Sequence, residues 1–124
     1  MNAAKKRKRI VSIAGFSESA AGTAASVRSN IALVLHHLEE DRYFPAELTP
    51  TLGHLRTALR ALYAAELGQP ERINRALEVC AASLQTALSD MNAHLMYSDS
   101  FQANIDRVET SLASLHSVRD ALGR

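Results

Sequence analysis

The strongest constraint on the fold is a heptad pattern of apolar residues between positions 73 and 95. Apolar side chains recur there at intervals of 4, 3, 4, 3, 4 and 4 residues, and they are Ile73, Leu77, Cys80, Leu84, Ala87, Met91 and Leu95. This spacing places all of them on one face of an α-helix, whereas a half-buried β-strand would need a period of two. The pattern therefore predicts a long amphipathic helix that packs its apolar face against other helices.

Three other segments show the same helical period, and no alternating strand pattern competes with it after residue 16. Their apolar faces consist of Val27, Ile31, Val34, Leu35 and Leu38, of Leu52, Leu55, Leu59 and Leu62, and of Phe101, Ile105, Val108, Leu112 and Leu115. Pro45 must end the first segment, because the residue before a proline avoids the helical region. Thr49 is predicted to cap the second helix, with Pro50 at its first position, and Gly68 to end it as a left-handed residue. Ser98, Asp99 and Ser100 offer N-caps for the last helix.

Four amphipathic helices joined by short turns predict an all-α fold. The helices are expected at about 17–44, 50–67, 70–96 and 99–122. Because each apolar face is too narrow to be buried by itself, the helices should close around one core as an antiparallel up-down four-helix bundle. The predicted domain spans residues 17–124 of a 124-residue chain, about the size of one ordinary domain. The alternative is an open layer of three helices that a second copy completes.

A basic and flexible arm of residues 1–16 is expected to precede the bundle. It holds every lysine of the chain in the run Lys5, Lys6, Arg7, Lys8 and Arg9, while the remaining chain has 9 arginines against 13 acidic residues. Such a run is a candidate contact for the phosphate backbone of nucleic acid. It has no aromatic side chain to stack on bases, so binding would be independent of sequence. The alternative is a solvated tail that aids solubility.

No membrane-spanning segment is expected, because the chain lacks a stretch of about 18 uncharged apolar residues. The apolar piece after the basic run is interrupted by Ser12 and Gly15 and stops at Glu18, which makes a weak signal peptide. One cysteine, Cys80, excludes a disulfide framework and a cysteine-rich zinc site. We expect a cytoplasmic protein, with export as the alternative because alanines between residues 20 and 24 resemble a cleavage site.

The sequence contains no nucleotide-binding loop, nucleophile elbow or metalloprotease motif. Two pairs have the four-residue spacing of helical metal ligands, His36 with Glu40 and Asp90 with His94. The first pair is expected to face solvent and the second to lie at the flank of an apolar face, whereas a metal site in a bundle needs inward ligands. Cys80 falls within the heptad pattern, where a thiol acts as a small apolar side chain. We therefore expect no catalytic residue, no cofactor and no metal.

One stretch is similar to the phosphorylated segment of histidine phosphotransfer domains, which are helical bundles of this size. It runs from His116 to Ala121, with Arg119 where those domains carry a lysine and Asp120 where they carry a glycine. The similarity implies a phosphorelay histidine at His116, although it covers six residues and does not assign the family. Small helical secretion and flagellar chaperones share the size and the helical hairpins, but not diagnostic residues. Phosphorelay-type and chaperone-like bundles are therefore alternative functions.

Four residues break the pattern of the helices that carry them. Leu33 and Val79 are apolar on the solvent side and are candidate interface residues. Glu66 and Arg119 fall in line with apolar faces. They reach water if those helix ends fray, and they could pair between helices or between subunits if the helices continue. The sequence predicts a non-enzymatic helical bundle that works by protein–protein binding, with a partner or as a homodimer. An accessory nucleic-acid-binding protein that uses residues 5–9 is the alternative.

Overall fold

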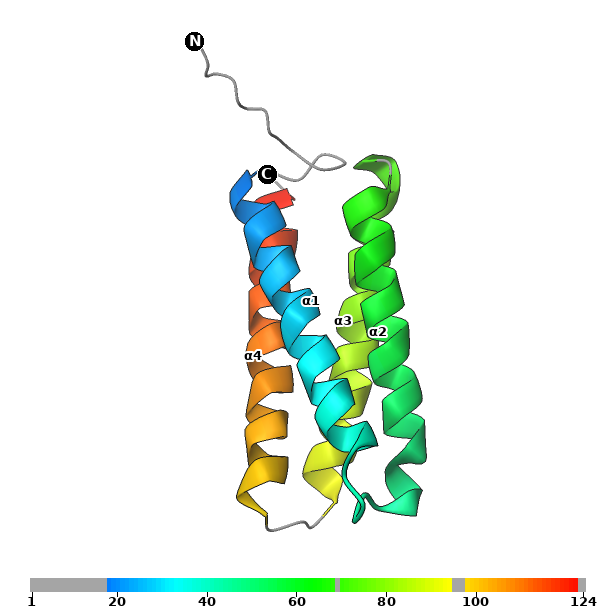
Figure 1. Ribbon diagram of the computed structural model, residues 1–124. Coiled ribbons are helices and arrows are strands. Elements are labelled where there is room, and N and C mark those ends of the chain that lie inside the picture. The colour runs from blue at the N-terminus through cyan, green and yellow to red at the C-terminus, as the bar shows by residue number, and fades with distance from the viewer. Residues whose placement is uncertain (1–17, 69, 95–97, 123–124) are drawn as a thin grey trace.

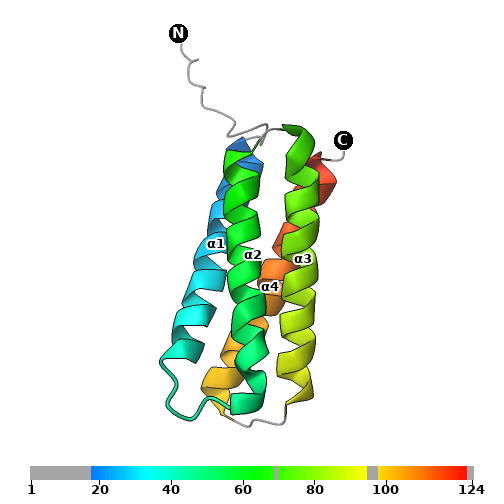
Figure 2. The same cartoon turned by 90° about the vertical axis from the view of Figure 1, so that its right-hand side faces the viewer.

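The computed structural model describes residues 18–68, 70–94 and 98–122, and these form four long helices that lie side by side (Figure 1). The elements are α1 (Glu18–Glu39), the short 3₁₀ helix η1 (Ala46–Leu48), α2 (Thr49–Leu67), α3 (Pro70–Ala93) and α4 (Asp99–Leu122). Consecutive helices run in opposite directions (Figures 1 and 2). Both α1 and α3 pack against α2 and α4, so that α1 and α3 lie on one diagonal of the bundle. The predicted all-α, up-down four-helix bundle is confirmed.

The core is built from the apolar faces that the sequence predicts. Along α3, all described members of the heptad pattern are buried: Ile73, Leu77, Cys80, Leu84, Ala87 and Met91. The inner face of α1 has the same alternating spacing, in Ala20, Ala24, Val27, Ile31, Val34 and Leu38. Each fully buried Leu or Ile side chain stabilises the folded state by about 1.5–3 kcal/mol relative to an exposed one. These aliphatic faces join in one core that holds the four helices together.

The first helix is shorter than predicted, because α1 ends at Glu39 and not near residue 44. Asp41 explains the early end. Its side-chain Oδ1 accepts a 2.9 Å hydrogen bond from the Tyr43 amide, and its carbonyl accepts a 3.0 Å bond from the Phe44 amide. Both bonds favour a tight turn over a further turn of helix, and Pro45 follows at once. The C-terminal end of α1 lies beside the first turns of α4, because α1 and α4 are antiparallel neighbours.

Two predicted helix ends are formed differently from the expected caps. Thr49 is the first residue of α2, and its hydroxyl donates a 2.8 Å hydrogen bond to a carbonyl of η1. Gly68 is extended, with φ −85° and ψ 173°, and is not left-handed. A side chain is still excluded there, because a Cβ atom would lie 2.7 Å from the carbonyl oxygen of Ala64. The start of α4 agrees with the prediction, since Ser98 Oγ accepts a 3.1 Å bond from the Phe101 amide.

Candidate binding sites on helix α1

The outward side of α1 is uncharged. Between Ser19 and Leu38, Arg28 is the one residue of the Asp, Glu, Lys and Arg class. We define the α1 surface as five exposed residues on this side, which are Gly22, Ser26, Ser29, Ala32 and Leu33. The exposed sides of the other helices carry charges, in Arg56 and Arg60 of α2, Arg72, Arg75 and Glu78 of α3, and Asp106, Glu109 and Asp120 of α4. Figure 1 is viewed from the side of α1.

Arg28 turns from α1 towards α2. Its Nε donates a 2.9 Å hydrogen bond to Glu66 Oε1, and its Nη2 donates a 3.3 Å bond to Oε2. The guanidinium carbon also lies 5.1 Å from the centre of the Tyr63 ring. The hydrogen bond to Glu66 raises the pKa of Arg28, because it stabilises the charged form. Since the carboxylate balances the guanidinium, Arg28 leaves the α1 surface without net charge.

The pairing of Glu66 with Arg119 between helices of one bundle is wrong. These residues belong to α2 and α4, which lie on the second diagonal of the bundle and are not neighbours. Glu66 is engaged by Arg28 of α1, and Arg119 Nη2 lies 3.9 Å from Glu78 Oε2 of α3. Glu66 and Arg119 therefore each pair with a charged residue on an adjacent helix.

Leu33 and Val79, the two candidate interface residues, are both partly exposed as expected, at 40% and 42%. They do not share a face, because α1 and α3 lie on opposite corners of the bundle (Figure 2). Leu33 follows the small residues of the α1 surface and precedes the exposed His36 and His37, whereas Val79 directly follows the exposed Glu78. A role for either residue at an interface stays a prediction.

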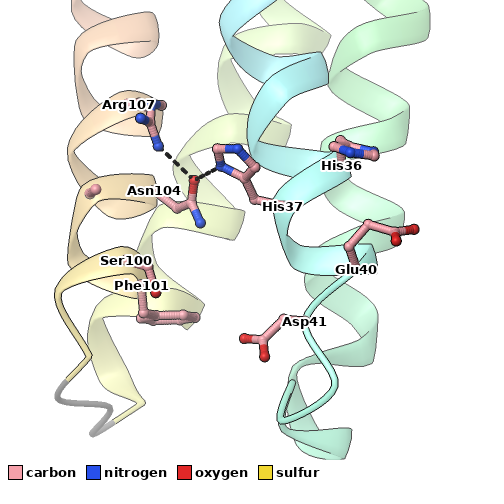
Figure 3. Close-up of a pocket in the computed structure, with 9 residues that line it drawn as sticks. His36, His37, Glu40, Asp41, Ser100, Phe101, Asn104 and Arg107 are labelled. Atoms are coloured by element: carbon pink, nitrogen blue, oxygen red, sulfur yellow. Dashed lines mark hydrogen bonds between the residues drawn. The ribbon is translucent and has the colours of Figure 1, made fainter.

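A hollow of about 440 Å³ opens between the C-terminal end of α1 and the first turns of α4 (Figure 3). Asn104, which is only 4% exposed, lies in its wall. The Asn104 Oδ1 accepts a 3.1 Å hydrogen bond from Arg107 Nη1 and lies 3.1 Å from His37 Nδ1. Phe101 and Asp41 also line the hollow. It thus combines an apolar ring with several polar groups that point towards one another, as small-molecule sites do.

Sequence reasoning gave no role to His37. It examined the neighbouring His36 because of the spacing to Glu40, and both of these residues are exposed as expected. The contact that distinguishes His37 is with Asn104, which lies 67 positions further along the chain. No local spacing rule could have found this pair, because it depends on which helix packs beside α1.

The remaining histidines do not form a ligand cluster. Asp90 Oδ2 of α3 lies 3.9 Å from His54 Nε2 of α2, and this contact links the two helices. His116 is exposed on α4. Within residues 18–68, 70–94 and 98–122, no group of three or more His, Cys, Asp or Glu side chains is arranged to hold a metal ion. None of the helices in the described part is long and apolar enough to cross a membrane.

Cys80 lies in the core of the bundle, as its place in the heptad pattern predicts. Its exposed fraction is 0%, and burial raises the pKa of its thiol to about 12. The thiolate is the reactive form of cysteine. Cys80 is therefore held in its unreactive form at neutral pH.

The basic run Lys5, Lys6, Arg7, Lys8 and Arg9 lies outside the described residues. Its contact with nucleic acid and the cytoplasmic location stay predictions from the sequence. Comparison with protein-family models, with curated proteins and with solved structures finds no match to this chain. Function has to be argued from the residues of the bundle.

Proposed function

We propose that the protein is a non-enzymatic binding protein that forms a homodimer through the α1 surface. The observation that supports this most directly is the row of small, uncharged residues on the outward side of α1, with Leu33 exposed among them. Small residues let two helices approach closely, and a large side chain on one helix fills the gap beside a small one on the other. A helix face of this kind suits contact with another helix.

A second copy of the chain fits this face by its charge. The described residues contain 8 arginines against 13 acidic residues, so the bundles of two copies repel each other, while the basic run brings the whole chain to a net charge of +1. The repulsion is weakest where an uncharged face meets another uncharged face. A dimer with a twofold axis brings the same face of both copies together, which allows the two α1 helices to pair in antiparallel directions.

The antiparallel pairing also matches large with small residues. When the twofold axis passes halfway between Leu33 and Gly22, each Leu33 lies over the Gly22 of the other copy. Space is free at that glycine, since among the described residues no heavy atom outside the backbone of α1 lies within 4 Å of the place for a Cβ. The small side chains of Ser26 and Ser29 then meet near the axis.

The test compares two glutamate variants of the full chain, Leu33→Glu and Val79→Glu. We expect the unchanged chain to sediment as a dimer. Leu33→Glu should raise the dimer dissociation constant by at least about tenfold, because it places an unpaired carboxylate in the interface opposite Gly22 of the other copy, and burying a charge without a partner is costly. Val79→Glu is the matched control, with nearly the same exposure on the diagonal helix, and should leave the dissociation constant unchanged.

Sedimentation velocity over a range of protein concentrations gives these constants, and circular dichroism checks that both variants keep the helical fold. A monomeric unchanged chain at every concentration would contradict the proposal. So would a dimer that Val79→Glu weakens as much as Leu33→Glu.

A further inference from the structure

One oxygen atom determines the hydrogen-bonding state of His37. Asn104 Oδ1 lies 3.1 Å from both Arg107 Nη1 and His37 Nδ1, as Figure 3 shows. A guanidinium nitrogen can only donate hydrogen bonds. The arginine therefore requires the oxygen, and not the nitrogen, of the Asn104 amide at this position.

The same oxygen then sets the tautomer of His37. Because Oδ1 only accepts, Nδ1 of His37 must carry the proton and donate it. In the neutral ring the second nitrogen, Nε2, consequently holds a free lone pair. His37 is an exposed residue, and its second ring nitrogen lies on the side away from Asn104 (Figure 3), so this lone pair can be reached from outside the bundle.

We propose that His37 is a phosphoryl-acceptor site, at which Nε2 takes a phosphoryl group from a small acyl phosphate. Histidine acts as a nucleophile through a neutral ring nitrogen that a partner on the other nitrogen holds in place. The Asn104 oxygen is such a partner, and its own position is fixed by Arg107 and by burial. Asn104 is in this sense a positioning residue.

The surroundings of His37 suit a phosphate-bearing ligand. Arg107 uses Nη1 for the bond to Asn104, and a guanidinium has further N–H groups that can bind phosphate oxygens. The adjacent hollow of about 440 Å³ is large enough for a small phosphoryl donor. Asp41 also lines it, with Oδ1 engaged by the Tyr43 amide. Glu40 lines it as well, with its carboxylate pointing away from Asn104 (Figure 3).

The transfer step conserves atoms and charge. The Nε2 lone pair attacks phosphorus, the N–P bond forms, and the bond between phosphorus and the acyl oxygen breaks. The carboxylate leaves with the bonding electron pair, and Nδ1 keeps its proton in the hydrogen bond to Asn104. The positive charge gained by the ring lies next to that oxygen, which stabilises the product.

The experiment uses the full chain with acetyl phosphate, and in a second series with phosphoramidate, a donor with another leaving group. Intact-mass measurement counts added phosphoryl groups, and ³¹P NMR at alkaline pH shows which ring nitrogen carries them. We expect one phosphoryl group, on Nε2 of His37. His37→Gln should abolish this label, because glutamine has no ring nitrogen that can form the N–P bond.

His36 supplies the matched control. It is the adjacent residue in the chain, is also exposed and also lines the hollow, but its ring points away from Asn104 (Figure 3). His36→Gln should leave the rate of labelling unchanged. Equal labelling of the two histidines, or no phosphohistidine with either donor, would overturn the proposal.

A third variant, Asn104→Leu, separates positioning from a general structural effect. It removes the acceptor that keeps the proton on Nδ1, so both tautomers become available. We expect the phosphoryl group to be divided between Nδ1 and Nε2 in the ³¹P spectrum, while circular dichroism shows an intact bundle. Labelling that stays on Nε2 alone at an unchanged rate would show that Asn104 does not position His37.

Discussion

The two helices α1 and α3 lie on one diagonal of the bundle, and they differ on the outside much more than on the inside. Both have an inner face of buried apolar residues at heptad spacing. On the outside, α3 carries Arg72, Arg75 and Glu78, whereas α1 carries small uncharged residues and Leu33. The inner faces must be apolar because they form the core, whereas core packing does not restrict which residues stand on the outer faces. This difference is the reason for proposing α1 as the helix that contacts other molecules.

The largest expected effect tests whether the inner faces are equivalent. Ile31→Ala in α1 and Leu77→Ala in α3 each remove a side chain with an exposed fraction of 0%. Each substitution should lower the free energy of unfolding by about 2–5 kcal/mol, because it removes buried methyl groups and leaves a cavity. Urea unfolding followed by circular dichroism gives both values, at one fixed protein concentration because dimerisation adds to stability. A loss at one position and none at the other would show that only one diagonal helix supports the core.

The next effect concerns the charges on the outer faces. Arg28→Met leaves the Glu66 carboxylate, which is 8% exposed, without its guanidinium partner. We expect a loss of at least about 1–3 kcal/mol in the free energy of unfolding, which is the range for a buried acceptor that loses its hydrogen bonds. The matched change on α3 is Arg75→Met at an exposed site, which should stay within about 0.5 kcal/mol. Equal effects from the two changes would mean that the Arg28–Glu66 pair contributes nothing beyond an ordinary surface arginine.

Local patterns in the sequence were enough to predict the architecture. The heptad pattern of α3 specifies a helix and its buried face, and Ser98 marks the start of α4 through one side-chain hydrogen bond. The end of α1 was also encoded locally, by the turn around Asp41. The sequence-based estimate missed it because apolar residues continue beyond that point.

The candidate sites needed the arrangement of the helices. Arg28 and Glu66 are 38 positions apart, and His37 and Asn104 are 67 positions apart. An amphipathic pattern shows which face of a helix is buried, but not which helix lies on either side of it. For that reason the sequence suggested Arg119 as the partner of Glu66, and it gave no sign that His37 differs from His36.

The smallest expected effect separates the two inner faces by pH. The α3 face contains one titratable group, Cys80, while the α1 face is aliphatic. The ordinary pKa of the thiol is 9.0, and burial raises it to about 12 in the folded chain. Between these values the unfolded chain loses the thiol proton and the folded chain keeps it, so the stability that is fully present below pH 9 falls as pH rises.

The slope from this one thiol is at most about 1.4 kcal/mol per pH unit. Tyrosines elsewhere in the chain titrate in the same range, so the measurement compares the unchanged chain with Cys80→Ala, in which those residues remain. Free energies of unfolding at pH 7 to 10.5 should decline more steeply for the unchanged chain, and the two curves should approach each other above pH 9. Parallel curves would show that the thiol titrates alike in the folded and unfolded chains. In that case water would reach Cys80 in the folded chain, and the inner face of α3 would be less well shielded from solvent than the inner face of α1.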